Sequence, residues 1–245
     1  MRRILIICWF LLACAVLTPA QKSKSWTEWN VKEATKVFND SAWGQTQTES
    51  ESSSQSTQTS AISSTTAAKE RNVRDADSAA RSSESGERKE GPTIHYYVRF
   101  MTAKPIRAAY VRLAELEGTA PEKLGQLKTL IDREFGDIIV VTLSIDGTDR
   151  KKMGPVLQEL MSADADGLKT TTFLERKDGK RIALSGYRTP QDAFGAKFVF
   201  PRTVDGKPFI DNESGEVRFI TEVGKVKINR RFKINEMIYE GKLEY

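Results

Sequence analysis

Hydrophobic positions change character several times along the chain. Residues 4–17 are an unbroken apolar run, and residues 21–43 carry aromatic side chains at helical intervals. Residues 44–91 hold almost no large apolar side chain, whereas residues 92–245 return to alternating and helical apolar patterns. We therefore expect a leader in residues 1–20, followed by a short helix, a linker and one globular domain.

The globular domain, residues 92–245, begins with a strand. Ile94, Tyr96, Val98 and Phe100 alternate with polar residues, which is typical of a half-buried strand. Apolar side chains at helical spacing predict helices in residues 105–116, 119–131 and 155–161. Further strands are predicted in residues 138–145, 170–176, 180–185, 196–200, 216–222 and 225–234. This order favours an α+β fold, with two or three helices packed on one face of a mainly antiparallel sheet.

The aromatic segment, residues 21–43, is expected to be a short amphipathic helix. Ser25 and Glu28 have the spacing of a capping box, and apolar residues follow at helical intervals. A helix this short is marginal alone in water, so its aromatic face must be buried. It packs either on its own C-terminal domain or on a protein or envelope-polymer partner. The candidate docking residues are Trp26, Trp29, Phe38 and Trp43.

Residues 44–91 are rich in Ser, Thr, Gln and Glu. Between positions 45 and 89 the only large apolar side chains are Ile62 and Val73. Such a segment cannot bury enough apolar surface to offset the loss of chain entropy. We therefore expect a disordered linker ahead of the globular domain.

The first 20 residues have the layout of a secretory signal peptide. Met1-Arg2-Arg3 precede the apolar run, and Thr18-Pro19-Ala20 follow it as a small-residue cleavage site. The run is shorter than the roughly 20 residues that span a membrane as a helix. We expect a periplasmic or extracellular protein with no transmembrane anchor after processing. Alternatively, residues 11–14 (LLAC) form a lipobox, and lipidation of Cys14 would give an outer-membrane lipoprotein.

The amino-acid composition excludes several kinds of chemistry. Both cysteines, Cys8 and Cys14, lie in the leader, which excludes disulfides, thiol catalysis and cysteine-zinc sites in the processed chain. A single histidine, His95, excludes metal motifs that need two. The formal net charge of +5 includes Arg2 and Arg3 of the leader and is too small to predict nucleic-acid binding. We predict no catalytic, cofactor-binding or metal-binding residue and no cofactor.

The predicted last strand, residues 225–234, is basic on one face. Lys227, Arg231 and Lys233 share that face, and Arg230 interrupts the apolar row on the other. The basic face is either a solvated strand surface or a contact for an anionic envelope lipid or polymer.

Other polar patterns have local explanations. His95, Tyr97 and Arg99 share a strand face, as a binding surface or as an ordinary exposed face. Residues 162–167 (SADADG) are similar to a calcium loop, but Phe173 occupies the twelfth position, where a glutamate is required, so we expect a polar loop. The Asp-Gly pairs beginning at positions 146, 178 and 205 are typical of turns.

Two stretches carry a resemblance to other proteins. One runs from Trp26-Thr27 to Phe38-Asn39-Asp40-Ser41-Ala42-Trp43, and the other is the closing FKINEMIYEGKLEY of residues 232–245. Together they resemble a group of uncharacterised exported proteins of soil bacteria, which pair an N-terminal tryptophan helix with a C-terminal α+β domain. The resemblance implies export and no known activity.

Two functions remain open from the sequence. The first is a non-catalytic envelope protein that binds or scaffolds through its C-terminal domain. The second is a carboxylate-dependent hydrolase that acts on cell-wall or polysaccharide material. A pair of carboxylates in a concave pocket would favour the hydrolase.

Overall fold

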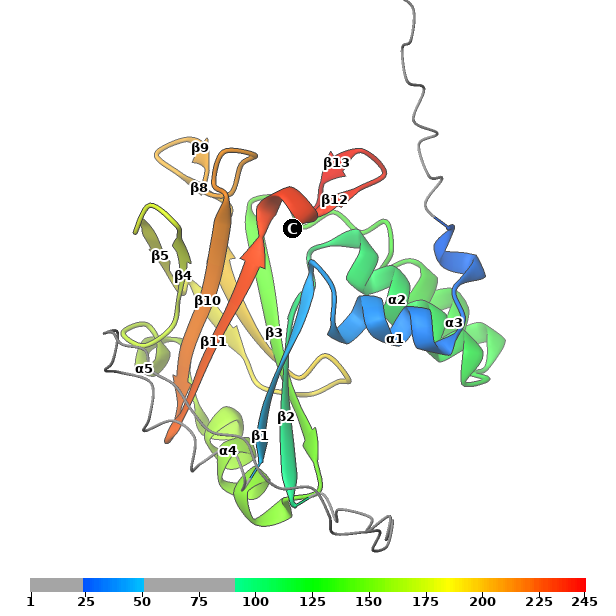
Figure 1. The fold of residues 1–245 in the computed structure, drawn as a ribbon, viewed down its shortest axis with the longest axis horizontal. Coiled ribbons are helices and arrows are strands. Elements are labelled where there is room, and N and C mark those ends of the chain that lie inside the picture. Colours follow the sequence, from blue (N-terminus) through cyan, green and yellow to red (C-terminus); the bar gives the residue numbers. More distant parts are fainter. Residues whose placement is uncertain (1–23, 51–90) are drawn as a thin grey trace, which may run out of the picture.

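Two antiparallel sheets form the centre of the molecule (Figure 1). The computed structural model describes residues 24–50 and 91–245. The larger sheet has the order β1-β2-β3-β7-β6, and the smaller sheet has the order β11-β10-β4-β5. Their strands are β1 (Gly44–Ser50), β2 (Thr93–Phe100), β3 (Ile138–Gly147), β4 (Phe173–Arg176), β5 (Arg181–Ala183), β6 (Gly186–Arg188), β7 (Ala196–Pro201), β10 (Glu216–Val223) and β11 (Val226–Lys233). The predicted α+β class is confirmed, with the strands divided between two sheets instead of one.

The core lies where the two sheets face each other. Phe100 of the larger sheet meets Phe232 of the smaller sheet edge-on, with ring centroids 4.8 Å apart. Phe198 meets Phe219 in the same way at 5.2 Å. All four rings are almost completely buried, and burial of apolar side chains supplies most of the stabilisation of such a core.

The two sheets join differently at their two sides. On one side the chain itself passes from β5 to β6, and the Ser185 amide between them donates to the Val199 carbonyl at 2.8 Å. On the other side the edge strands β1 and β11 meet through side chains. Gln47 Nε2 donates to the Lys227 carbonyl at 2.9 Å, and Arg230 Nη1 donates to the Thr46 carbonyl at 2.8 Å. We call this contact the β1–β11 seam.

The helices lie at two ends of the sheets. Figure 1 shows α1 (Val31–Asn39), α2 (Lys104–Leu116) and α3 (Pro121–Lys128) beside β1, β2 and β3, and α4 (Arg150–Ser162) at the opposite end of the strands. The predicted helices at positions 105, 119 and 155 are all present, although α4 begins earlier because Asp149 caps it and accepts from the Lys152 amide at 3.1 Å. A short helix, α5 (Ala165–Leu168), was not predicted.

The closing part of the chain adds small elements near the C-terminus. A 3₁₀ turn, η3, follows β11, and two short hairpins complete the fold. Their bounds are β8 (Thr203–Val204), β9 (Lys207–Pro208), η3 (Ile234–Glu236), β12 (Ile238–Tyr239) and β13 (Lys242–Leu243). Among the described residues, none of the helices has the length and hydropathy needed to cross a membrane.

The predicted helix of residues 21–43 is divided into two pieces. A 3₁₀ turn, η1 (Trp26–Glu28), precedes α1. Asn30 separates the two pieces because it is the N-cap of α1: its side chain accepts from the Glu33 amide at 2.9 Å. Glu33 completes a capping box with the Asn30 amide at 2.8 Å.

The prediction that the linker begins at Gly44 was wrong. Residues 44–50 form β1, which pairs with β2 along its whole length from Gly44↔Arg99 to Ser50↔Thr93. The composition conceals this strand, because its stability comes from the backbone ladder and from polar side chains at the seam rather than from an apolar face. The remainder of the predicted linker, residues 51–90, lies outside the described residues. The predicted leader and Cys14 also lie outside them.

Candidate anion-binding site

The predicted docking residues pack against the chain's own domain. Trp29 and Phe38 are each 8% exposed, and Phe38 contacts the rings of Tyr110 and Phe194. Trp26 and Trp43 are partly buried against the same core. The structure therefore shows the intramolecular alternative for this segment, and it leaves Trp29 and Phe38 without a free face for a partner.

Arg99 holds the end of α1 on the sheet. Its Nε donates to the Phe38 carbonyl at 3.0 Å, its Nη2 donates to Asn39 Oδ1 at 2.6 Å, and its Nη1 donates to Ser144 Oγ at 2.7 Å. The guanidinium carbon lies 4.0 Å from the centre of the Phe38 ring. Only 3% of Arg99 is exposed, and this burial lowers its pKa. The expectation of an exposed face containing Arg99 was therefore wrong, because α1 covers it.

The other residues of that face keep local partners. His95 Nδ1 lies 2.9 Å from Thr48 Oγ1, and its ring is tilted against Tyr97 at 6.1 Å. In residues 162–167, the segment that is similar to a calcium loop, Asp164 caps α5 and accepts a hydrogen bond from the Gly167 amide at 2.7 Å. Within residues 24–50 and 91–245, no group of three or more His, Cys, Asp or Glu side chains is placed to hold a metal ion.

The three predicted anion contacts on β11 each have a carboxylate beside them. Lys227 pairs with Glu222 at 2.9 Å, Arg231 with Glu216 at 3.0 Å, and Lys233 with Glu236 at 2.9 Å. All three cations are well exposed, so water and salt screen these pairs and each contributes little to stability. Of the three, Arg231 also lines a hollow in the described surface.

That hollow lies at the β1–β11 seam and has a volume of about 390 Å³. Residues of β1, β10 and β11 line it, and we call it the arginine hollow: Gln45, Arg218, Asn229, Arg230 and Arg231. Its arginines meet for a geometric reason. Arg218 and Arg231 are directly opposite in the β10–β11 ladder, and Arg230 is the next residue along the edge strand.

The arginines have more donors than the protein satisfies. Arg218 Nη2 pairs with Glu175 at 2.7 Å, but its buried Nε has no hydrogen-bond acceptor and lies 3.9 Å from Glu216. Arg230 bonds only to the carbonyls of Thr46 and Asn229, and within the described chain it has no carboxylate partner. Burial lowers the pKa of Arg230, as expected for a cation with no counter-charge beside it. The hollow therefore has an excess of positive charge.

Sequence reasoning identified one member of this site and did not assign a function to its centre. Arg231 belonged to the predicted basic face. Arg230 was visible as a charge in the apolar row of β11, among the inward-facing Ile228 and Phe232. A charged residue in an apolar row is the sequence signal that could have indicated this site. The residues that surround Arg230 follow only from the position of β1 beside β11.

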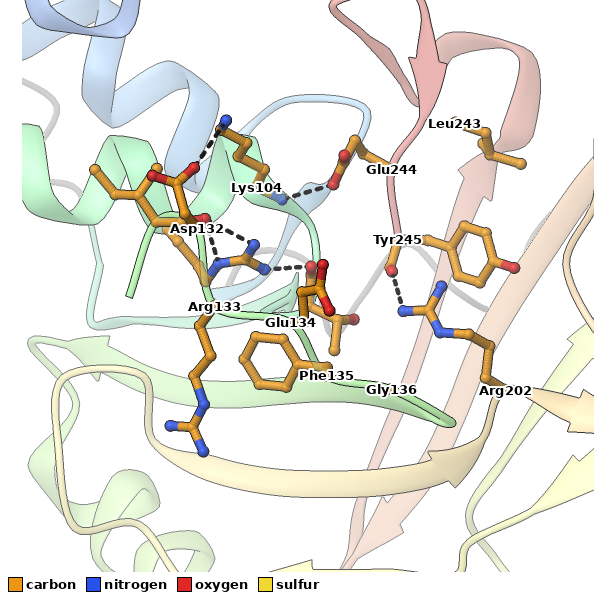
Figure 2. Close-up of a pocket in the computed structure, with 13 residues that line it drawn as sticks. Lys104, Asp132, Arg133, Glu134, Phe135, Gly136, Arg202, Leu243, Glu244 and Tyr245 are labelled. Atoms are coloured by element: carbon orange, nitrogen blue, oxygen red, sulfur yellow. Dashed lines mark hydrogen bonds and ion pairs between the residues drawn. The ribbon is translucent and has the colours of Figure 1, made fainter. Parts of the chain in front are cut away.

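A second hollow, of about 450 Å³, lies near the C-terminus (Figure 2). The loop before α2, the segment between α3 and β3, the end of β7 and the C-terminal residues line it. Its carboxylates include Asp132, which pairs with Lys104 Nζ at 3.0 Å, and Glu244, which accepts from the Lys104 amide at 3.1 Å. Both of these carboxylates therefore neutralise or cap a neighbouring group.

Comparison of this chain with protein-family models, with curated proteins and with solved structures finds no match.

Proposed function

We propose that this chain is an exported, non-catalytic binding protein, and that its arginine hollow takes an anionic group of an envelope polymer. The observation that carries the proposal is the convergence of Arg218, Arg230 and Arg231 on one hollow without a carboxylate in its lining. Guanidinium groups suit this task because their planar N–H donors match the oxygens of phosphate or carboxylate groups.

A polymer is favoured over a single small anion by the surface around the hollow. Lys227, Arg231 and Lys233 continue along the exposed face of β11. Residues on one face of a strand repeat at about 7 Å, which suits a chain with regularly spaced negative charges. The glutamates beside these cations would be partly displaced as the polymer binds, so we expect an affinity that falls with salt.

Residues 1–20 support the exported location, because they have the order of a charged, an apolar and a small-residue region. Export would place the domain where anionic envelope polymers are found.

The hydrolase is less well supported. In the hollow of Figure 2, Asp132 pairs with the Lys104 ammonium at 3.0 Å, and Glu244 accepts a hydrogen bond from the Lys104 amide at 3.1 Å. Both carboxylates are therefore already engaged by neighbouring groups of the protein instead of being left free for a substrate.

The proposal is tested by the effect of inorganic phosphate on thermal unfolding. A ligand that binds only the folded chain stabilises it by an amount that grows with the logarithm of the ligand concentration divided by the dissociation constant, and so raises its melting temperature. We expect phosphate to stabilise the natural protein, and Arg230→Gln to weaken its affinity at least tenfold. Lys227→Gln removes the same charge from the same strand outside the hollow and should change affinity by less than twofold.

Equal stabilisation of the natural protein and Arg230→Gln would contradict the site. Binding to vesicles that contain phosphatidylglycerol, without any binding to polyphosphate, would contradict a polymer ligand and indicate a lipid instead. Unfolding without phosphate shows whether Arg230→Gln has opened the seam.

A further inference from the structure

The hollow of Figure 2 has opposite charges on its two sides. Arg202 donates through Nη2 to the Tyr245 backbone oxygen at 2.7 Å, but its Nε is buried and has no acceptor in the described structure. Glu134, from the segment between α3 and β3, forms no ion pair or hydrogen bond with any described residue. Figure 2 shows Glu134 and Arg202 on opposite sides of the hollow, while the Arg133 guanidinium is turned away from it.

The Arg202 side is held in place by its neighbours. Its guanidinium carbon lies 4.4 Å from the centre of the Tyr245 ring. Tyr245 is 8% exposed, and its hydroxyl donates to the Ile210 carbonyl at 2.8 Å. A cation positioned over a fixed aromatic ring loses little further freedom when it binds a ligand.

Arg107 adds positive charge to the same wall. It is only 4% exposed, and its guanidinium bonds to neutral backbone carbonyls, those of Met101, Thr102 and Ile131. It forms no ion pair with a described residue, and the nearby carboxylates of Glu244 and Asp132 offset only part of its charge, because neither contacts the guanidinium. A carboxylate bound at Arg202 would therefore also be attracted by Arg107.

We propose that this hollow binds a small zwitterion, an amino acid or short peptide, with its carboxylate at Arg202 and its ammonium at Glu134. A simple anion would be repelled by Glu134, and a simple cation would be repelled by Arg107 and Arg202. The volume of about 450 Å³ is in the range of small-molecule sites. This site is separate from the arginine hollow and does not depend on the function proposed for it.

Calorimetric titration with the dipeptide alanyl-alanine tests the proposal. N-acetyl-alanyl-alanine lacks the ammonium, and alanyl-alanine amide lacks the carboxylate. We expect the free dipeptide to bind and each capped form to bind at least tenfold more weakly. Glu134→Gln should weaken the free dipeptide tenfold but should not weaken the N-acetylated form, which has no ammonium to pair with Glu134 and would no longer be repelled by it.

Glu122→Gln is the matched control, since it removes the same charge from an exposed position on α3 that does not line the hollow. It should bind the dipeptide as the natural protein does. Glu134 is exposed, so its substitution should leave the fold intact. No binding of the free dipeptide, equal binding of the three compounds, or an unchanged affinity in Glu134→Gln would overturn the proposal.

Discussion

The indole Nε1 of Trp43 donates a hydrogen bond of 2.9 Å to the backbone oxygen of Glu244, although the two residues are 201 positions apart. The Trp43 ring also meets Tyr239 edge-on, with centroids 6.2 Å apart. The two stretches that carry the family resemblance, one near each end of the described chain, thus contact each other. Their contact fixes the segment before β1 against the C-terminal residues.

Replacing Trp43 tests the strength of this contact. Trp43→Phe keeps an aromatic ring but removes the donor, so we expect a loss of about 1 kcal/mol in the free energy of unfolding. Trp43→Ala should cost more, about 3 kcal/mol, because packing is lost as well. Urea unfolding measures both. Val31→Ala, at a side chain 57% exposed, should change stability by less than about 0.5 kcal/mol. Natural stability in Trp43→Phe would show that the hydrogen bond contributes nothing.

Gln47 should control the local stability of the β1–β11 seam. Its side chain donates to the Lys227 carbonyl at 2.9 Å and accepts from the Asn229 amide at 3.5 Å. We expect Gln47→Ala to speed hydrogen exchange at the Asn229 amide several-fold while exchange in the core strand β3 stays the same. Lys225 is exposed in the turn before β11, and Lys225→Gln should leave the hydrogen-exchange rate of the Asn229 amide unchanged. Unchanged exchange in Gln47→Ala would mean that other contacts close the seam.

Tyr187 should make the fold sensitive to alkali. Burial raises its pKa to about 12, and its hydroxyl donates to the Leu160 carbonyl at 2.6 Å. Because a tyrosine in the unfolded chain loses its proton near pH 10, stability should fall between about pH 10 and pH 12. Tyr187→Phe lacks the hydrogen bond, but it also lacks the hydroxyl that titrates, so this variant does not lose the Tyr187 contribution to stability as the pH rises. Its deficit in unfolding free energy should therefore be smaller at pH 11 than at pH 8. A constant deficit would contradict the raised pKa.

The proposed export predicts a defined N-terminus for the processed protein. Cleavage after Ala20 would leave Gln21 as the first residue. Mass spectrometry of the protein from its native cells should give the unmodified mass from Gln21. A chain that begins at a lipidated Cys14 would favour the lipoprotein alternative, and a soluble chain that retains Met1 would contradict export.

The local periodicity of apolar residues was sufficient to predict most of the helices and strands. Ile94 and Phe100 mark the inward face of β2 through alternation, and Gly224 adopts the positive φ that the β10–β11 turn requires. Local sequence patterns do not show which element will cover a given face of a strand. Arg99 belongs to the polar side of β2 by pattern, yet α1 buries it because Phe38 and Asn39 supply its partners.

The candidate site depends on contacts that no local pattern contains. The sequence shows Arg230 as a charge in an apolar row, but β1, which adjoins it, has the composition of a linker. The arginine hollow exists only because strands from distant parts of the chain, β1 and β10, flank β11.

The affinity of polyphosphate, measured by calorimetry at low and at physiological salt, tests the proposed function most directly. The arginine hollow predicts that Arg230→Gln weakens binding at least tenfold at both salt concentrations. Lys151→Gln removes the same charge from an exposed position on α4 and should weaken binding by less than twofold. Equal affinities of Arg230→Gln and Lys151→Gln would show that polyphosphate senses only net charge, and would contradict a binding site at the β1–β11 seam.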